Sequence, residues 1–223
     1  MIDTLEKNLE QIIDTTITIK KKLNIDTQYF VVTIHRPSNL SDENLENIFN
    51  GLKKFSKEYT IILPAHPRLK KYISKNNVRH ENILIIDPLS YIDFLGLVNG
   101  SELVLTDSGG LQEETTHLNV KCLTIRNETE RPITVSEGTN KVIGVDTEII
   151  ISEINNAIES KLSVGKKIKF WDGLGDRLGA LRGSFGSIFG RFGEIIFPYF
   201  PIFFLVVVVV VVLVVVVVVV VSM

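Results

Sequence analysis

Short apolar runs alternate with longer amphipathic segments along most of the chain, and this alternation constrains the fold more than any other feature. The runs expected to be strands are Tyr29–Ile34, Thr60–Leu63, Ile83–Ile86, Leu103–Thr106, Lys121–Ile125 and Lys141–Val145. Continuous β-branched runs are typical of strands buried on both faces of a parallel sheet. Strand, polar loop and helix repeated five or six times predict right-handed βαβ units. The expected fold class is therefore α/β, with a Rossmann-like doubly wound parallel sheet.

The segments between these runs carry apolar residues at helical spacing. The helices expected at the two ends of the domain are Asp3–Leu23 and Asp146–Leu162, and another is expected to begin after Ser41, a plausible N-cap. A short helix follows the loop PAHPR, one runs through Val98, and one starts at Leu111.

Polar residues that could carry a function follow the predicted strands. In doubly wound sheets, ligands bind at the carboxyl ends of the strands. The residues found there include His35 and Arg36 after one strand, and His66 and Arg68 after the next. Two histidines and two arginines on one rim could neutralise a diphosphate. Each pair taken alone could instead be solvated loop charges or helix caps.

The stretch DSGGLQEE, Asp107 to Glu114, is the sharpest feature of the sequence. Free N–H groups at a helix N-terminus attract anions, and Gly109 and Gly110 would let a phosphate approach the backbone. The hydroxyl of Ser108 can donate one more hydrogen bond, and Glu114 is placed to accept hydrogen bonds from ribose hydroxyls. The alternative is a tight turn in which Asp or Ser caps the helix.

The remaining features exclude several classes of function. Arg131 could pair with a phosphate or form a salt bridge to Glu128 or Glu130. The single cysteine, Cys122, lies in an apolar run and is expected in the core, so a disulfide framework is excluded. No metal-ligand spacing, GxSxG or phosphate-binding P-loop is present, so no metal is expected. A formal net charge of −2 gives no indication of nucleic-acid binding.

Six segments, in the right order and spacing, resemble one family specifically. They are VVTIHRPSNLSDENL, PAHPR, IDPLSYIDFLGLV, LVLTDSGGLQEETT, RNETERPITVSEGTN and GKKIKFWDG. Together they resemble the C-terminal half of the non-hydrolysing UDP-N-acetylglucosamine 2-epimerases, over about residues 2–173. The DSGG-QEE and TERP blocks are the specific ones, whereas HR and HPR alone are not.

This resemblance implies a fold and a reaction. The family has the two-domain architecture of GT-B glycosyltransferases, and its C-terminal domain holds UDP. UDP is eliminated to leave a 2-acetamidoglucal and then added back with the other configuration at C2, which uses no redox cofactor. Ser108, Gly109 and Gly110 would hold phosphate, Glu114 would hold ribose, Arg131 and His35 would lie by the diphosphate, and His35 would assist the departure of UDP. Members are commonly homodimers, and a cytoplasmic enzyme of cell-surface polysaccharide synthesis is expected.

The chain departs from the family in three ways. The N-terminal domain, with the acidic residues that handle the C2 proton, is missing, so residues 1–28 read as a helical remnant of the interdomain crossover before a UDP-binding domain at 29–173. We therefore expect the chain alone to bind UDP weakly and not to epimerise. Ser38 and Ile133 stand where many members have Glu. After residue 173 the family's closing helix is replaced by a Gly/Arg/Phe linker at 174–194 and an apolar tail at 195–221.

The tail contains 27 uncharged residues and is mostly valine. As a helix it would be about 40 Å long, enough for a bilayer core of about 30 Å. Arginines precede it, which would leave the domain cytoplasmic and membrane-anchored. Near-homopolymeric valine is also what translated repeat DNA or a frameshift produces, so a sequence artefact is the competing interpretation.

Three other functions stay open at this point. The domain could be the donor-nucleotide half of a GT-B glycosyltransferase, because the fold is shared. It could belong to a hydrolysing relative that releases ManNAc. It could also be a membrane-tethered UDP-binding remnant with no catalysis. The DSGG-QEE and TERP blocks favour the epimerase.

Overall fold

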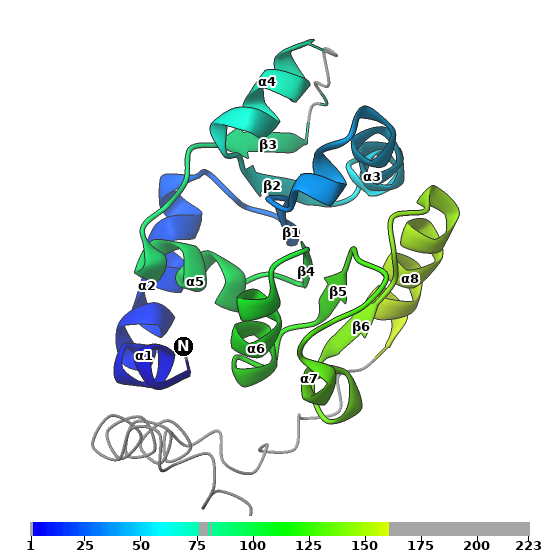
Figure 1. Cartoon of the computed structure of the whole chain (residues 1–223). Helices are drawn as coiled ribbons and strands as arrows, with labels where there is room; N and C mark the ends of the chain where they lie inside the picture. The colour runs from blue at the N-terminus through cyan, green and yellow to red at the C-terminus, as the bar shows by residue number, and fades with distance from the viewer. Residues whose placement is uncertain (1, 76–79, 81, 161–223) are drawn as a thin grey trace, which may run out of the picture. The chain divides into compact units, whose positions relative to one another are not determined.

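The computed structural model describes residues 2–75, 80 and 82–160, and these form a six-stranded parallel sheet covered by helices (Figure 1). The strand order is β3-β2-β1-β4-β5-β6. The strands are β1 Tyr29–Thr33, β2 Thr60–Pro64, β3 Ile83–Ile86, β4 Leu103–Thr106, β5 Cys122–Thr124 and β6 Asn140–Val142. All five strand pairs are parallel. The predicted doubly wound α/β fold is confirmed.

The two faces of the sheet carry separate cores because side chains alternate along each strand. On β1, Phe30 and Val32 enter one core, while Tyr29 and Val31 enter the other. The helices of the first core are α3 Asp42–Phe55, α4 Pro67–Lys75 and α8 Thr147–Glu159. Those of the second are α1 Ile2–Lys7, α2 Leu9–Lys22, α5 Tyr91–Asn99 and α6 Gly109–His117. Figure 1 shows α3 and α8 on one side of the sheet and α2 and α5 on the other.

The helices that precede β1 are packed closely onto the domain. At Gly96 of α5, a Cβ atom would lie 2.9 Å from Thr15 Cγ2 and 3.2 Å from the Thr15 carbonyl carbon, so only glycine allows α2 to approach this closely. Asn99 Nδ2 also donates a 3.0 Å hydrogen bond to Thr16 Oγ1. The buried Tyr29 hydroxyl donates to Leu97 O at 2.7 Å and so joins β1 to α5.

Helix boundaries are where the sequence predictions were wrong. The helix expected at residues 3–23 is two helices, because the chain breaks at Asn8, whose Nδ2 donates to Thr4 O at 2.7 Å and competes with the helical pattern. The helix expected from Leu111 begins at Gly109. Asp146, expected as the first helical residue, is the N-cap of α8, and its carboxylate accepts from two backbone N–H groups at 3.0 Å.

Two short helices complete the described part. They are the 3₁₀ helix η1 Pro37–Leu40 and α7 Pro132–Ser136. Ser41 caps α3 as predicted, accepting from Asn44 N. Cys122 is buried as predicted, and burial raises the pKa of its thiol to about 12.

The linker at 174–194 and the valine-rich tail at 195–221 lie outside the described residues. Within the part of the chain that the structure describes, none of the helices has the length and apolarity that a bilayer crossing requires.

Candidate functional site

The adjacent central strands β1 and β4 send the chain to opposite faces of the sheet. Thr33 and Thr106, the last residues of β1 and β4, are paired in the sheet, and their two hydroxyls share a buried 2.7 Å hydrogen bond. After β1 the chain enters α3 in the first core, whereas after β4 it enters α6 in the second. Doubly wound sheets bind ligands at such a switch point. The predicted residues His35, Arg36 and 108–110 follow these two strands.

Asp107, the residue after β4, is fully buried and binds the loop that follows β1. Its carboxylate accepts the backbone N–H of His35 at 3.0 and 3.1 Å and that of Arg36 at 2.9 Å. The Asn39 amide donates to the same carboxylate at 3.3 Å, and His35 Nδ1 lies 2.9 Å from Oδ1. One carboxylate therefore fixes both loops. The sequence analysis placed Asp107 after a strand and suggested only a capping role for it, so its contact with the His35 loop was missed.

The state of Asp107 determines what the imidazole of His35 can do. Burial alone would raise the pKa of Asp107, but hydrogen bonds from the His35 ring and from the backbone N–H groups of Arg36 and His35 outweigh it and lower the pKa below its ordinary value. An ionised carboxylate can only accept, so Nδ1 of His35 must carry a proton. This leaves Nε2 of a half-exposed ring as the atom that gains or loses a proton.

The N-terminus of α6 lies beside this histidine loop. Ser108 is the N-cap, and its hydroxyl accepts from Leu111 N at 3.4 Å. A hydroxyl that accepts one hydrogen bond still has a proton to donate. Gly109 and Gly110 are the first two helical residues, so their N–H groups have no acceptor within the helix. The capping role suggested as an alternative for Ser108 and the anion-binding role are thus compatible.

Glu114, in the second turn of α6, is buried and hydrogen-bonded within the domain. It is 6% exposed, and its Oε1 accepts a 3.0 Å hydrogen bond from the Tyr91 hydroxyl at the start of α5. Burial raises its pKa, and the Tyr91 hydrogen bond offsets this only partly. The half-exposed Tyr91, which the sequence analysis missed, connects this buried acid to the surface.

The TERP segment, residues 129–132, contacts α6 through the residue before Glu130 and the residue after it. Thr129 Oγ1 donates to Gln112 Oε1, and Arg131 Nε lies 3.0 Å from Glu113 Oε1. The suggested salt bridge from Arg131 to Glu128 or Glu130 was therefore wrong, because the carboxylate that Arg131 contacts is that of Glu113 in α6.

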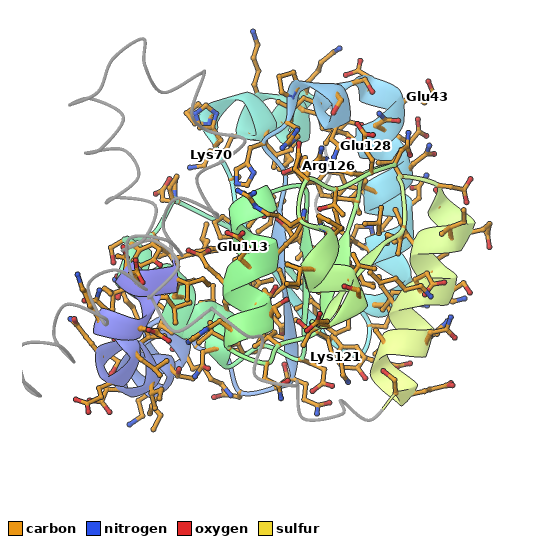
Figure 2. The ribbon with its side chains drawn as sticks, turned by 60° about the horizontal axis from the view of Figure 1, so that its bottom comes forward. Glu43, Lys70, Glu113, Lys121, Arg126 and Glu128 are labelled. Carbon is orange, nitrogen blue, oxygen red and sulfur yellow. The ribbon has the colours of Figure 1, made fainter. Side chains whose placement is uncertain are left out.

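Glu130 is held by two arginines. Its carboxylate makes a bidentate pair with Arg126, at 2.6 and 2.9 Å, and a 3.2 Å contact with Arg36 Nη2. Figure 2 shows Arg126 and Glu128 at one end of the sheet and Lys121, which precedes β5, at the other. The arginines thus gather at the carboxyl ends of β1 and β5. The sequence analysis noted the charges of this loop but not their pairing.

The other two predicted residues follow β2, which adjoins β1 on the side away from β4. His66 is exposed, and its carbonyl accepts from Lys70 N in the first turn of α4. No hydrogen bond or ion pair joins it to the other predicted site residues within the described ranges. Arg68 lies in α4, and its side chain is outside the described part.

No metal centre accompanies this arrangement in the described part of the chain. Among residues 2–75, 80 and 82–160, no group of three or more His, Cys, Asp or Glu side chains could hold a metal ion.

Comparison with known proteins identifies the family. The family model for UDP-N-acetylglucosamine 2-epimerase matches residues 1–177, more than half of the chain. The chain belongs to this family. The UDP-N-acetylglucosamine 2-epimerase of Methanocaldococcus jannaschii is 40% identical over 145 residues, which cover 61% of this chain and 40% of that protein.

Solved structures of the epimerase family agree with the fold. The structure of the M. jannaschii enzyme in complex with UDP-GlcNAc and UDP is 32% identical, with a TM-score of 0.61, over 76% of this chain and 53% of that one. The Neisseria meningitidis epimerase bound to UDP-GlcNAc is 28% identical, with a TM-score of 0.64, over 74% of this chain and 50% of that one. The chain spans about 40% of the length of the first curated epimerases it matches.

Proposed function

We propose that this domain is the UDP-binding half of a UDP-GlcNAc 2-epimerase. The observation that carries the proposal is the placement of the Asp107-held His35 beside the glycine N-terminus of α6, in a chain of this family. The phosphates of UDP would lie against Ser108, Gly109 and Gly110, and Arg36 would neutralise their charge. His66 and Arg68, which follow β2, and Arg131, which contacts Glu113 of α6, are further phosphate-binding candidates.

Glu114 would bind the ribose of the same nucleotide. Its carboxylate is fixed by the Tyr91 hydroxyl, so Oε2 and the remaining lone pairs of Oε1 are available to accept from ribose hydroxyls. Buried and partly desolvated, such hydrogen bonds are stronger than they would be in water.

His35 would move the proton that accompanies the departure of UDP. The bond between C1 of the sugar and the UDP oxygen breaks, and protonated Nε2 donates its proton to the leaving diphosphate. When UDP adds back to the glucal, neutral Nε2 takes that proton again. Asp107 stays ionised throughout and stabilises the imidazolium.

We propose that the 223-residue chain binds UDP without epimerising UDP-GlcNAc. Epimerisation also requires a group that removes the proton at C2. Of the carboxylates described above, Asp107 is paired with His35, Glu113 with Arg131 and Glu130 with the arginines Arg126 and Arg36, and Glu114 is assigned to the ribose. Turnover of UDP-GlcNAc by the purified chain would refute this part of the proposal.

Calorimetric titration of the full chain with UDP tests the binding site, with Gly109→Ala as the diagnostic variant. A Cβ at this position would lie 3.6 Å from Glu130 Oε2, an ordinary contact, so the fold should tolerate alanine. The added methyl group would stand where a phosphate approaches the helix, and loss of one charge-assisted hydrogen bond lowers affinity by about tenfold. Uridine, which has no phosphate, should bind both proteins equally. Equal UDP affinity for the two proteins would show that the phosphates of UDP do not bind at the N-terminus of α6.

A further inference from the structure

We infer that the carboxylate of Glu130 occupies the place of a ligand phosphate, so that nucleotide binding exchanges one anion for another. The inference deepens the proposed function, on which it rests, by naming Arg126 as a phosphate-binding residue and Glu130 as its internal competitor.

The contacts of Glu130 are those expected of a bound oxyanion. Arg126 Nη1 and Nη2 donate hydrogen bonds to its two oxygens at 2.6 and 2.9 Å, and Arg36 Nη2 donates to Oε1 at 3.2 Å. Two guanidinium groups on one carboxylate, one of them bidentate, form an arrangement that fits a phosphate equally well. The hydrogen bonds from Arg126 lower the pKa of Glu130 to about 2. The Glu130 carboxylate is therefore anionic at every working pH.

The same carboxylate lies over the N-terminus of α6. Glu130 Oε2 is 3.6 Å from the place a Cβ would take on Gly109, the first residue of the helix. Exposed N–H groups and the positive end of the helix dipole favour an anion at this point. An anion is thus already present where a phosphate of UDP is proposed to bind.

Glu130 can leave this place without disturbing the loop that carries it. Its side chain is 54% exposed, whereas that of Arg126 is 9% exposed and so is fixed by its surroundings. The residues on either side of Glu130 are anchored to α6, Thr129 through Gln112 and Arg131 through Glu113. A rotation of the Glu130 side chain therefore frees both guanidinium groups while the backbone and Arg126 stay in position.

Removing an internal competitor raises the affinity for the external ligand. If the Glu130 carboxylate is bound to the two arginines in about 70–90% of unliganded molecules, removing its charge strengthens UDP binding by about three- to tenfold. Glu130→Gln keeps the size of the side chain and removes the charge, so calorimetric titration of the full chain with UDP should show this increase.

The matched control is Glu128→Gln, which removes the same charge from the same loop. Glu128 acts on Arg126 through Coulomb interaction, whereas Glu130 is also hydrogen-bonded to it. It should change UDP affinity by less than about twofold at 0.15 M salt, where charges beyond about 8 Å are screened.

Each outcome of the comparison between Glu130→Gln and Glu128→Gln either supports or overturns the exchange of Glu130 for a phosphate. Tighter UDP binding by Glu130→Gln alone supports the exchange. Unchanged or weaker binding overturns it, and weaker binding would make Glu130 a residue that positions the arginines. Equal tightening by both variants overturns it in favour of a general charge effect. If the unsubstituted chain and both variants all fail to bind UDP, the proposed function falls together with this inference.

Discussion

Replacing Asp107 with asparagine should both destabilise the domain and change the tautomer of His35. The two carboxylate oxygens accept the backbone N–H groups of His35 and Arg36 and the ring Nδ1–H of His35. An asparagine can keep one oxygen facing the backbone, but its NH₂ group must then face Nδ1. Since NH₂ only donates, Nδ1 must become the acceptor and the ring proton must move to Nε2.

The expected loss of stability follows from the hydrogen bonds to a charged acceptor. These contribute about 1.5–3 kcal/mol each, against about 0.5–1.5 kcal/mol between neutral groups. Weakening the two backbone bonds by about 1 kcal/mol each gives about 2 kcal/mol. A neutral amide is also less costly to bury than a carboxylate, which offsets part of this, so the free energy of unfolding should fall by about 1–2 kcal/mol.

Urea denaturation and ¹⁵N NMR of the histidine rings measure the two effects. The folded-state pKa of Asp107 lies below its ordinary value of 3.8, so its stabilisation is present above that value and is lost as the pH falls through the folded-state pKa. The difference between the two proteins should therefore shrink in acid. The control is Asp87→Asn, in which an exposed acid after β3 loses its pairing with Lys70 and stability changes by less than about 0.5 kcal/mol. An Asp107→Asn protein with unchanged stability and Nδ1 still protonated would refute the reasoning.

Two further predictions concern buried groups at and behind the site. Burial raises the pKa of Glu114, so the ionised carboxylate is disfavoured in the folded protein. The folded protein therefore loses stability as the pH rises through the folded-state pKa of Glu114. Glu114→Gln, which carries no charge, should raise the melting temperature at pH 8. It should also weaken UDP binding about tenfold in calorimetry, and a lower melting temperature would contradict this assignment. Cys122, with a buried thiol of pKa about 12, should resist alkylation in native buffer and react in urea; rapid native labelling would place it at the surface.

The sheet could be predicted from sequence because its strands are continuous apolar runs. Such runs can be buried only between two layers of helices, and their alternation with amphipathic segments leaves few topologies. Helix ends were harder because they depend on single hydrogen bonds, such as the one that Asn8 makes to Thr4. The start of α6 was misjudged because Gly109 and Gly110 have low helix propensity, although Ser108 before them is a common N-cap.

The site was predicted in part, by the rule that functional residues follow strands. That rule selected His35, Arg36 and Ser108, and the structure brings their loops together. It could not show which polar groups satisfy one another. The contact between Arg36 and Glu130 joins residues 94 positions apart, so it depends on the finished sheet rather than on local spacing.

The candidate site is assembled from two parts of the polypeptide that are remote in sequence. His35 belongs to the β1-β2-β3 half and Ser108 to the β4-β5-β6 half, and within the sheet the two halves are joined through β1 and β4. Closing a loop of some 70 residues carries an entropic cost that must be met before any contact across this seam can form, so the proposed nucleotide site should be a late product of folding. A nascent chain released before β4 would contain three strands and His35, but not the Ser108 loop at which a diphosphate is proposed to bind.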